Sequence, residues 1–110
     1  RVCSAMKKTS WPLFNRKFKG FGGEEGYMQE KVRQSGGRTL CLPFLKWVHR
    51  FGRPNGVPYK LSLIDRVVNY LIGWHELGLD VGEIIDHFSK QLHSHELLES
   101  LKRFEDSKMV

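Results

Sequence analysis

Apolar residues recur with helical spacing in three consecutive segments of the second half of the chain. In the first segment, which follows Ser62, the apolar positions are Ile64, Val67, Val68, Leu71, Ile72 and Trp74, and the remaining polar strip is Asp65, Arg66, Asn69 and Glu76. A helix that is apolar on most sides is buried on most sides, so this helix is expected to be central. Ser62 can cap its start, and Gly78 can end it because glycine adopts the left-handed conformation at little cost.

The next two segments carry helix-start signals of their own. Asp80 followed by Glu83 is a capping-box pattern, and it precedes a stripe of Val81, Ile84, Ile85, Phe88 and Leu92. Ser94 is expected to cap the last helix, with Glu99 placed to pair with Lys102 or Arg103. The inward positions predicted for that helix are Leu97, Leu98, Leu101 and Phe104. The short joints between these helices favour packing of neighbours against each other.

Residues 43–53 are predicted to form an amphipathic helix in the first half. Pro43 suits a first helical turn, and Phe44, Trp47, Val48 and Phe51 share one face. The outer face is then Lys46, His49 and Arg50, with Arg53 just beyond. A loop is indicated by the residues that follow, namely Gly52, Pro54, Asn55, Gly56 and Pro58.

Two shorter helices are predicted upstream. Thr9 or Ser10 is expected to start one with Trp11, Phe14 and Phe18 on one side, and residues 24–34 are expected to form another that ends at Gly36 and Gly37. No segment alternates convincingly with the two-residue period of a strand. We therefore predict an all-α fold, a compact bundle of about five short helices with Gly/Pro-rich loops in the N-terminal half.

The length of the chain indicates one domain, and the distribution of charge divides that domain into two halves. A chain of 110 residues and 12.8 kDa suits one domain, residues 1–110, with a net charge of +6. Residues 1–60 hold thirteen Lys or Arg against three Glu and nine of the thirteen aromatic residues, whereas residues 61–110 hold five basic and nine acidic residues. We expect a basic, aromatic-rich half on an acidic three-helix scaffold, and an anionic partner for the basic half.

The basic half predicts a nucleic-acid-binding surface, with RNA slightly favoured over DNA and recognition mainly of backbone and shape. The predicted contact residues are Lys7, Lys8, Arg16, Lys17, Lys19, Arg38, Lys46, His49, Arg50 and Arg53. Phe18 and Phe21 lie among cations and are candidates for stacking on bases. The alternative for this stretch is that Phe14 and Phe18 belong to the core while the neighbouring cations form a solvated face.

More specific chemistry finds no support in the motifs. Residues 19–22 match the opening of the RNA-recognition-motif signature, but Gly23, Glu24 and Glu25 follow where strand residues are required. Phosphate-loop signatures, metal-ligand spacings such as Cys-x-x-Cys and a nucleophile elbow are not found. We therefore expect no enzyme activity, no metal and no cofactor.

Two other functions stay open. The capped C-terminal helices could serve as a helical protein interaction or dimerisation module, or the protein could be a viral matrix-like domain that binds anionic membrane surfaces, with Trp11, Phe14 and Phe18 in the headgroups. With two cysteines, Cys3 and Cys41, and no apolar run long enough for a transmembrane segment, an intracellular location, cytoplasmic or nuclear, is expected. The start at Arg1 indicates a processed product or a domain of a longer protein.

Overall fold

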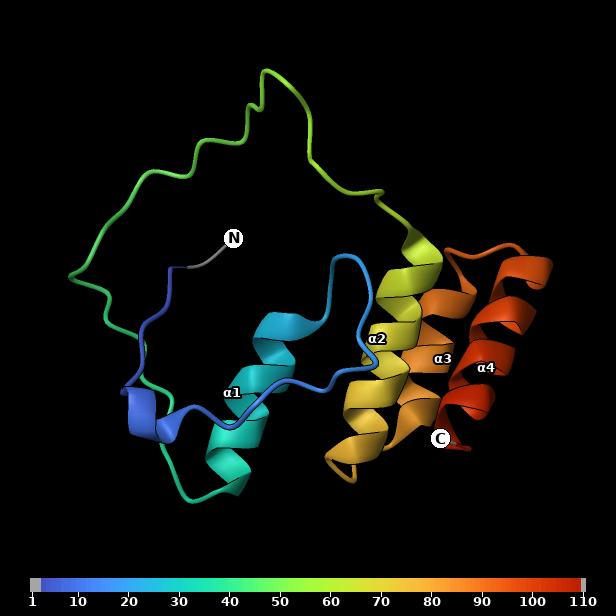
Figure 1. The fold of residues 1–110 in the computed structure, drawn as a ribbon, viewed down its shortest axis with the longest axis horizontal. Coiled ribbons are helices and arrows are strands. Elements are labelled where there is room, and N and C mark those ends of the chain that lie inside the picture. The colour runs from blue at the N-terminus through green and yellow to red at the C-terminus, as the bar shows by residue number, and fades with distance from the viewer. Residues whose placement is uncertain (1–2, 110) are drawn as a thin grey trace.

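The computed structural model describes residues 3–109 and is all-helical over that range (Figure 1). Its elements are a 3-10 turn at Lys8–Ser10 and four α-helices, namely α1 (Glu24–Gln34), α2 (Leu63–Glu76), α3 (Val81–Ser89) and α4 (Ser94–Lys108). The described residues contain no strand, which confirms the all-α class, but the α-helices number four rather than about five. Arg1, counted in the basic half, lies outside the described residues.

The helix α2 begins and ends at the predicted signals. The hydroxyl of Ser62 accepts a hydrogen bond from the backbone N–H of Asp65 at 3.2 Å. At the other end Gly78 has φ 73°, and the N–H of Leu79 donates to the carbonyl of Trp74 at 2.9 Å. This left-handed closure satisfies carbonyls that the last turn leaves without a helical partner.

The core forms where α3 and α4 pack on one side of α2 (Figure 1). Its buried members are Val67, Val68, Leu71, Ile72, Ile84, Phe88, Leu92 and Phe104. A salt bridge of 2.9 Å between Asp65 and Arg103 joins α2 to α4. The helices α2, α3 and α4 thus pack together, with α2 in contact with both of the others.

The start of α3 agrees with the sequence prediction, and three details of α4 differ from it. Asp80 caps α3 through the N–H of Gly82 at 2.9 Å, as expected. The N-cap of α4 is His93 rather than Ser94, because the Glu96 carboxylate accepts from the backbone N–H of His93 at 3.0 Å. The inward placement of Leu98 was wrong: its side chain is 67% exposed. Arg103 pairs with Asp65 across the bundle instead of with Glu99 along its own helix.

The helix α1 has the predicted bounds and lies on the opposite side of α2 from α4 (Figure 1). It ends as predicted at Gly36, with φ 90°, where the N–H of Gly37 donates to the carbonyl of Val32 at 3.0 Å. It meets α2 at Gly73, whose missing side chain makes room for two rings. A Cβ there would lie 3.0 Å from Tyr27 and 3.1 Å from Phe18.

The predicted helix over residues 43–53 is absent, and this is the largest difference from the sequence prediction. Residues 36–62 instead form an open arc between α1 and α2 (Figure 1). It has two hydrogen-bonded turns, in which the N–H of Leu45 donates to the carbonyl of Leu42 at 3.1 Å and the N–H of Gly56 donates to the carbonyl of Arg53 at 3.0 Å. An isolated helix of this length is marginal in water unless its apolar face is buried. Phe44, Val48 and Phe51 are 70% or more exposed, so no such burial stabilises a helix here.

The short helix predicted from Thr9 or Ser10 is reduced to the 3-10 turn. Leu13, with φ 59°, leaves the right-handed helical region, so the chain cannot continue as a helix through it. It proceeds instead across α1, and Phe14 and Phe18 reach Tyr27.

Candidate nucleic-acid interface

The stretch of residues 14–19, predicted as part of the binding surface, is largely a docking segment. Phe18 packs against the core, with its ring centroid 4.8 Å from that of Tyr27 and 5.7 Å from that of Phe14. These contacts engage the ring, so the base-stacking role of Phe18 stays a prediction that its packing disfavours. The alternative interpretation, that Phe14 and Phe18 belong to the core, holds only in part: Phe18 is partly buried against the core, whereas Phe14 is 38% exposed.

Asn69 fixes the glycine-rich turn that follows. Its side-chain carbonyl accepts from the N–H of Lys19 at 2.9 Å, and its amide donates to the carbonyls of Lys19 at 2.8 Å and Gly22 at 3.1 Å. Asn69, a member of the polar strip of α2, is only 2% exposed, so this part of the strip is buried. The amide of Asn69 supplies both a donor and an acceptor, and these satisfy the backbone groups of Lys19 and Gly22 in the turn. The turn therefore lies over the polar strip of α2.

Glu76, about two turns further along α2 than Asn69, anchors the same segment and α1 together. Its carboxylate accepts from Asn15 at 2.8 Å and from the Tyr27 hydroxyl at 2.6 Å, and it pairs with Lys31 at 3.2 Å. Burial alone would raise the pKa of Glu76, but the hydrogen bonds from Tyr27, Asn15 and Lys31 outweigh burial and hold it below its ordinary value. Burial and the bond to Glu76 raise the pKa of Tyr27, so the phenol remains a donor.

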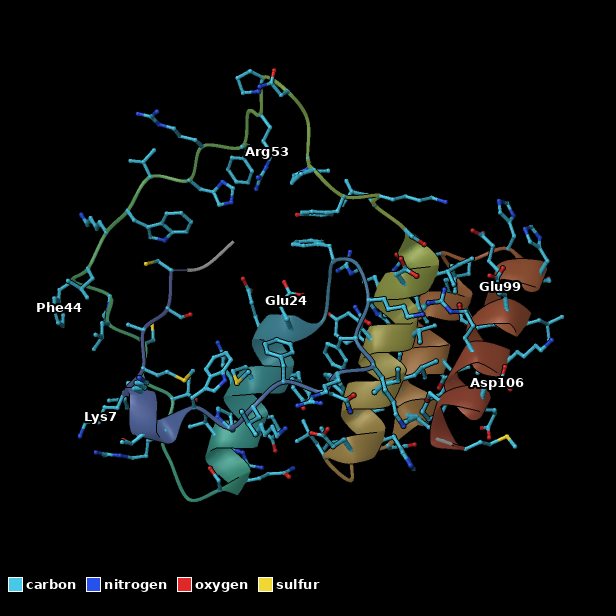
Figure 2. The ribbon with its side chains drawn as sticks, in the orientation of Figure 1. Lys7, Glu24, Phe44, Arg53, Glu99 and Asp106 are labelled. Carbon is cyan, nitrogen blue, oxygen red and sulfur yellow. The ribbon has the colours of Figure 1, made fainter. Side chains whose placement is uncertain are left out.

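The predicted cations of residues 7–19 do not act as one group. Lys17 donates to the backbone carbonyl of Ser107 at the end of α4, which turns it toward the C-terminal helix. The backbone N–H of Lys19 is bound by Asn69, but the side chain of Lys19 is exposed. The side chains of Lys7, Lys8 and Arg16 are exposed as well. Lys7 lies at the start of the 3-10 turn, well separated from Arg53 on the arc (Figure 2).

The cations of the arc form the more coherent set. Arg38, Lys46, Arg50, Arg53 and Lys60 are all exposed. None of the five forms an ion pair with a carboxylate among residues 3–109. Figure 2 places Phe44 and Arg53 on the arc, whereas Glu99 and Asp106 lie on α4, at the end of the long axis opposite to Phe44. The acidic outer face of α4 is therefore turned away from the arc.

Aromatic side chains accompany these cations. His49 lies between two rings, with its centroid 5.2 Å from that of Trp47 and 3.9 Å from that of Phe51. Phe21, a predicted stacking residue, is 49% exposed and stacks on Tyr59 with ring planes 17° apart. Sequence reasoning missed Trp47, Phe51, Tyr59 and Lys60 as members of this surface. The alternation of rings at 47, 49 and 51 was the available signal, and it was hidden by the helical spacing of the same stretch.

We also searched the described residues for a pocket, a metal site and a membrane-spanning helix. An open hollow of about 440 Å³ lies beside α1 and is lined in part by Arg33, Arg38 and Leu40. Within residues 3–109 no group of three His, Cys, Asp or Glu side chains is placed to hold a metal ion. Over the same range, none of the helices combines the length and the apolar content that a bilayer crossing requires.

Comparisons with protein-family models, curated proteins and solved structures found no match.

Proposed function

We propose that the protein binds single-stranded nucleic acid, RNA in preference to DNA, through residues 38–60. The observation that carries the proposal is the arc itself, in which five exposed cations without ion pairs alternate with exposed aromatic rings. Cations neutralise phosphates, and aromatic faces stack on bases that are not paired. A duplex hides those base faces, so single strands are the better match.

The electrostatic part of this proposal has a measurable size. If each of the five cations of the arc contacts one phosphate, the logarithm of the binding constant falls with the logarithm of salt concentration with a slope of about −3 to −4. Backbone contacts of this kind carry no sequence information, so sequence preference is expected to be modest.

Charge reversal at Lys46 and Arg50 tests the proposal. We expect the double variant Lys46→Glu and Arg50→Glu to bind single-stranded RNA at least about 10-fold more weakly and with a salt slope smaller by about 1.4, because two phosphate contacts are lost. The measurement is a salt titration with single-stranded RNA, duplex RNA and duplex DNA of equal length. Lys90→Glu with Lys102→Glu, two exposed lysines outside the arc, is the matched control. Equal losses in the two double variants would contradict a site on the arc.

One observation favours a second candidate, binding to an anionic membrane surface. Phe44, Trp47, Val48 and Phe51 have the spacing of one helical face and are each 50% or more exposed, and Lys46 and Arg50 would lie opposite. A basic helix with an aromatic face is the pattern of interfacial membrane helices. Co-sedimentation with vesicles rich in phosphatidylserine, together with a gain of helix by circular dichroism, would support this candidate over nucleic acid.

A further inference from the structure

Three rings form a row along the arc. Trp47, His49 and Phe51 are separated by two residues each, and in an extended chain such residues point to the same side. The contacts show this, because His49 meets both neighbours while Val48, between them, is 85% exposed. The row is therefore a consequence of the extended backbone rather than of sequence spacing alone.

The spacing of this row suits the thickness of a base. Two residues of extended chain advance about 6.6 to 6.8 Å. Bases stack at about 3.4 Å, so one base between two successive rings needs about twice that separation. Side chains anchored at this interval can hold a base between them once the contact of His49 with Phe51 opens from 3.9 Å.

His49 carries a second, independent sign of a missing partner. Its Nδ1 atom is the one buried side-chain nitrogen or oxygen among residues 3–109 that has no hydrogen-bond partner. A buried polar atom without a partner costs free energy, and a ligand that reaches it would recover that cost. That ligand must approach in the plane of the imidazole, where the edge of a base that lies beside the ring offers donors and acceptors and a base stacked on its face does not.

We propose that Trp47, His49 and Phe51 form a base-stacking ladder that takes unpaired bases of RNA between its rings. The inference rests on the proposed function and specifies which part of the arc reads the bases. Lys46 precedes the row, Arg50 lies within it and Arg53 follows it, and these charges would hold the phosphates. The ladder requires the extended state of the segment.

A helical state of the same residues makes a different prediction. In a helix Trp47 and Phe51 share a face because they are four residues apart, whereas His49 faces the other way. The ladder requires all three rings, but a helix on an apolar surface requires only Trp47 and Phe51. His49 therefore discriminates between the two states.

The experiment measures binding of a short adenosine oligoribonucleotide and of an abasic oligomer of the same length, which keeps the phosphates without the bases. The variants are Trp47→Leu, His49→Leu and Phe51→Leu, each of which removes a ring and keeps apolar bulk. Phe44→Leu, an exposed ring of the same segment outside the row, is the control. We expect each row variant to lose about 5-fold or more in affinity for the RNA. On the abasic oligomer all variants should match the wild type, and the control should match it on both.

The outcomes separate the ladder from the function it rests on. If the wild type binds neither oligomer, the proposed function fails and the ladder fails with it. If the wild type binds both oligomers equally and the row variants are unchanged, backbone binding stands and the ladder is overturned. A loss confined to Trp47 and Phe51, with a gain of helix by circular dichroism, also overturns the ladder and favours the helical state.

Discussion

The helix α2 and residues 43–53 carry the same helical spacing of apolar residues, yet only α2 is a helix. Leu71 of α2 is fully buried in the core that α2 forms with α3 and α4, whereas Leu45 of the arc is 64% exposed. The surfaces of α2 that could have received a further helix are occupied by the N-terminal segment on one side and by α3 and α4 on the other. The comparison teaches that amphipathic spacing specifies a helix only where the chain also supplies a surface to bury it.

The largest effect on the free energy of unfolding is expected when the same substitution, Leu to Ala, is made once in α2 and once in the arc. Leu71→Ala should lower the free energy of unfolding by about 3 kcal/mol because it leaves a cavity in the core, and Leu45→Ala should change it by less than about 0.5 kcal/mol. Urea denaturation of both variants measures the contrast. A comparable loss in Leu45→Ala would show that the arc packs in solution and would remove the basis of the comparison.

A smaller effect is expected at Asn69, where a polar residue of α2 is buried by the N-terminal segment. Asn69→Ala should cost about 2 kcal/mol, since it leaves the backbone groups of Lys19 and Gly22 without partners. Amide exchange of residues 19–23 should accelerate more than that of α3. Asn55→Ala in the exposed part of the arc is the control, and an equal change in both variants would refute the anchoring role of Asn69.

The charge of Glu76 should make this docking sensitive to acid. Because the folded pKa of Glu76 lies below its ordinary value, the carboxylate contributes stability above about pH 4.5 and loses it as the pH falls through the folded pKa. Glu76→Gln should cost about 1 kcal/mol at neutral pH and should flatten the fall of stability below pH 4.5. Thermal unfolding across pH measures both. Glu99→Gln, on the exposed face of α4, should keep the wild-type profile; a profile flattened equally there would count against Glu76.

The smallest expected effect is a gain. Leu13 is 70% exposed and adopts φ 59°, a region that asparagine tolerates better than leucine. Leu13→Asn should therefore raise the free energy of unfolding by about 0.5 kcal/mol. Leu40→Asn, equally exposed in the arc, should leave it unchanged by the same denaturation assay. A loss at Leu13 would mean that its side chain contributes packing that outweighs the backbone strain.

In the candidate site, the exposed cations could be predicted from the sequence, but the burial of the aromatic residues could not. The exposed cations Arg38, Lys46, Arg50 and Arg53 were predicted from charge alone, since charged side chains rarely become buried. Phe18 could not be told from Phe21 by sequence, because both are aromatic residues among cations. Only the space left by Gly73 decides that one of them is core.

The sequence by itself determined the helices that carry their own signals: Ser62, Gly78, Asp80 and Gly36 set helix ends through local hydrogen bonds and backbone preference, which need no distant partner. Tertiary structure decided which apolar faces were buried. Asn69 and Glu76 became anchors, and residues 43–53 remained extended, because burial depends on which surfaces meet once the chain has folded. That competition for the surface of α2 involves residues far apart in the chain, so no local pattern could reveal its outcome.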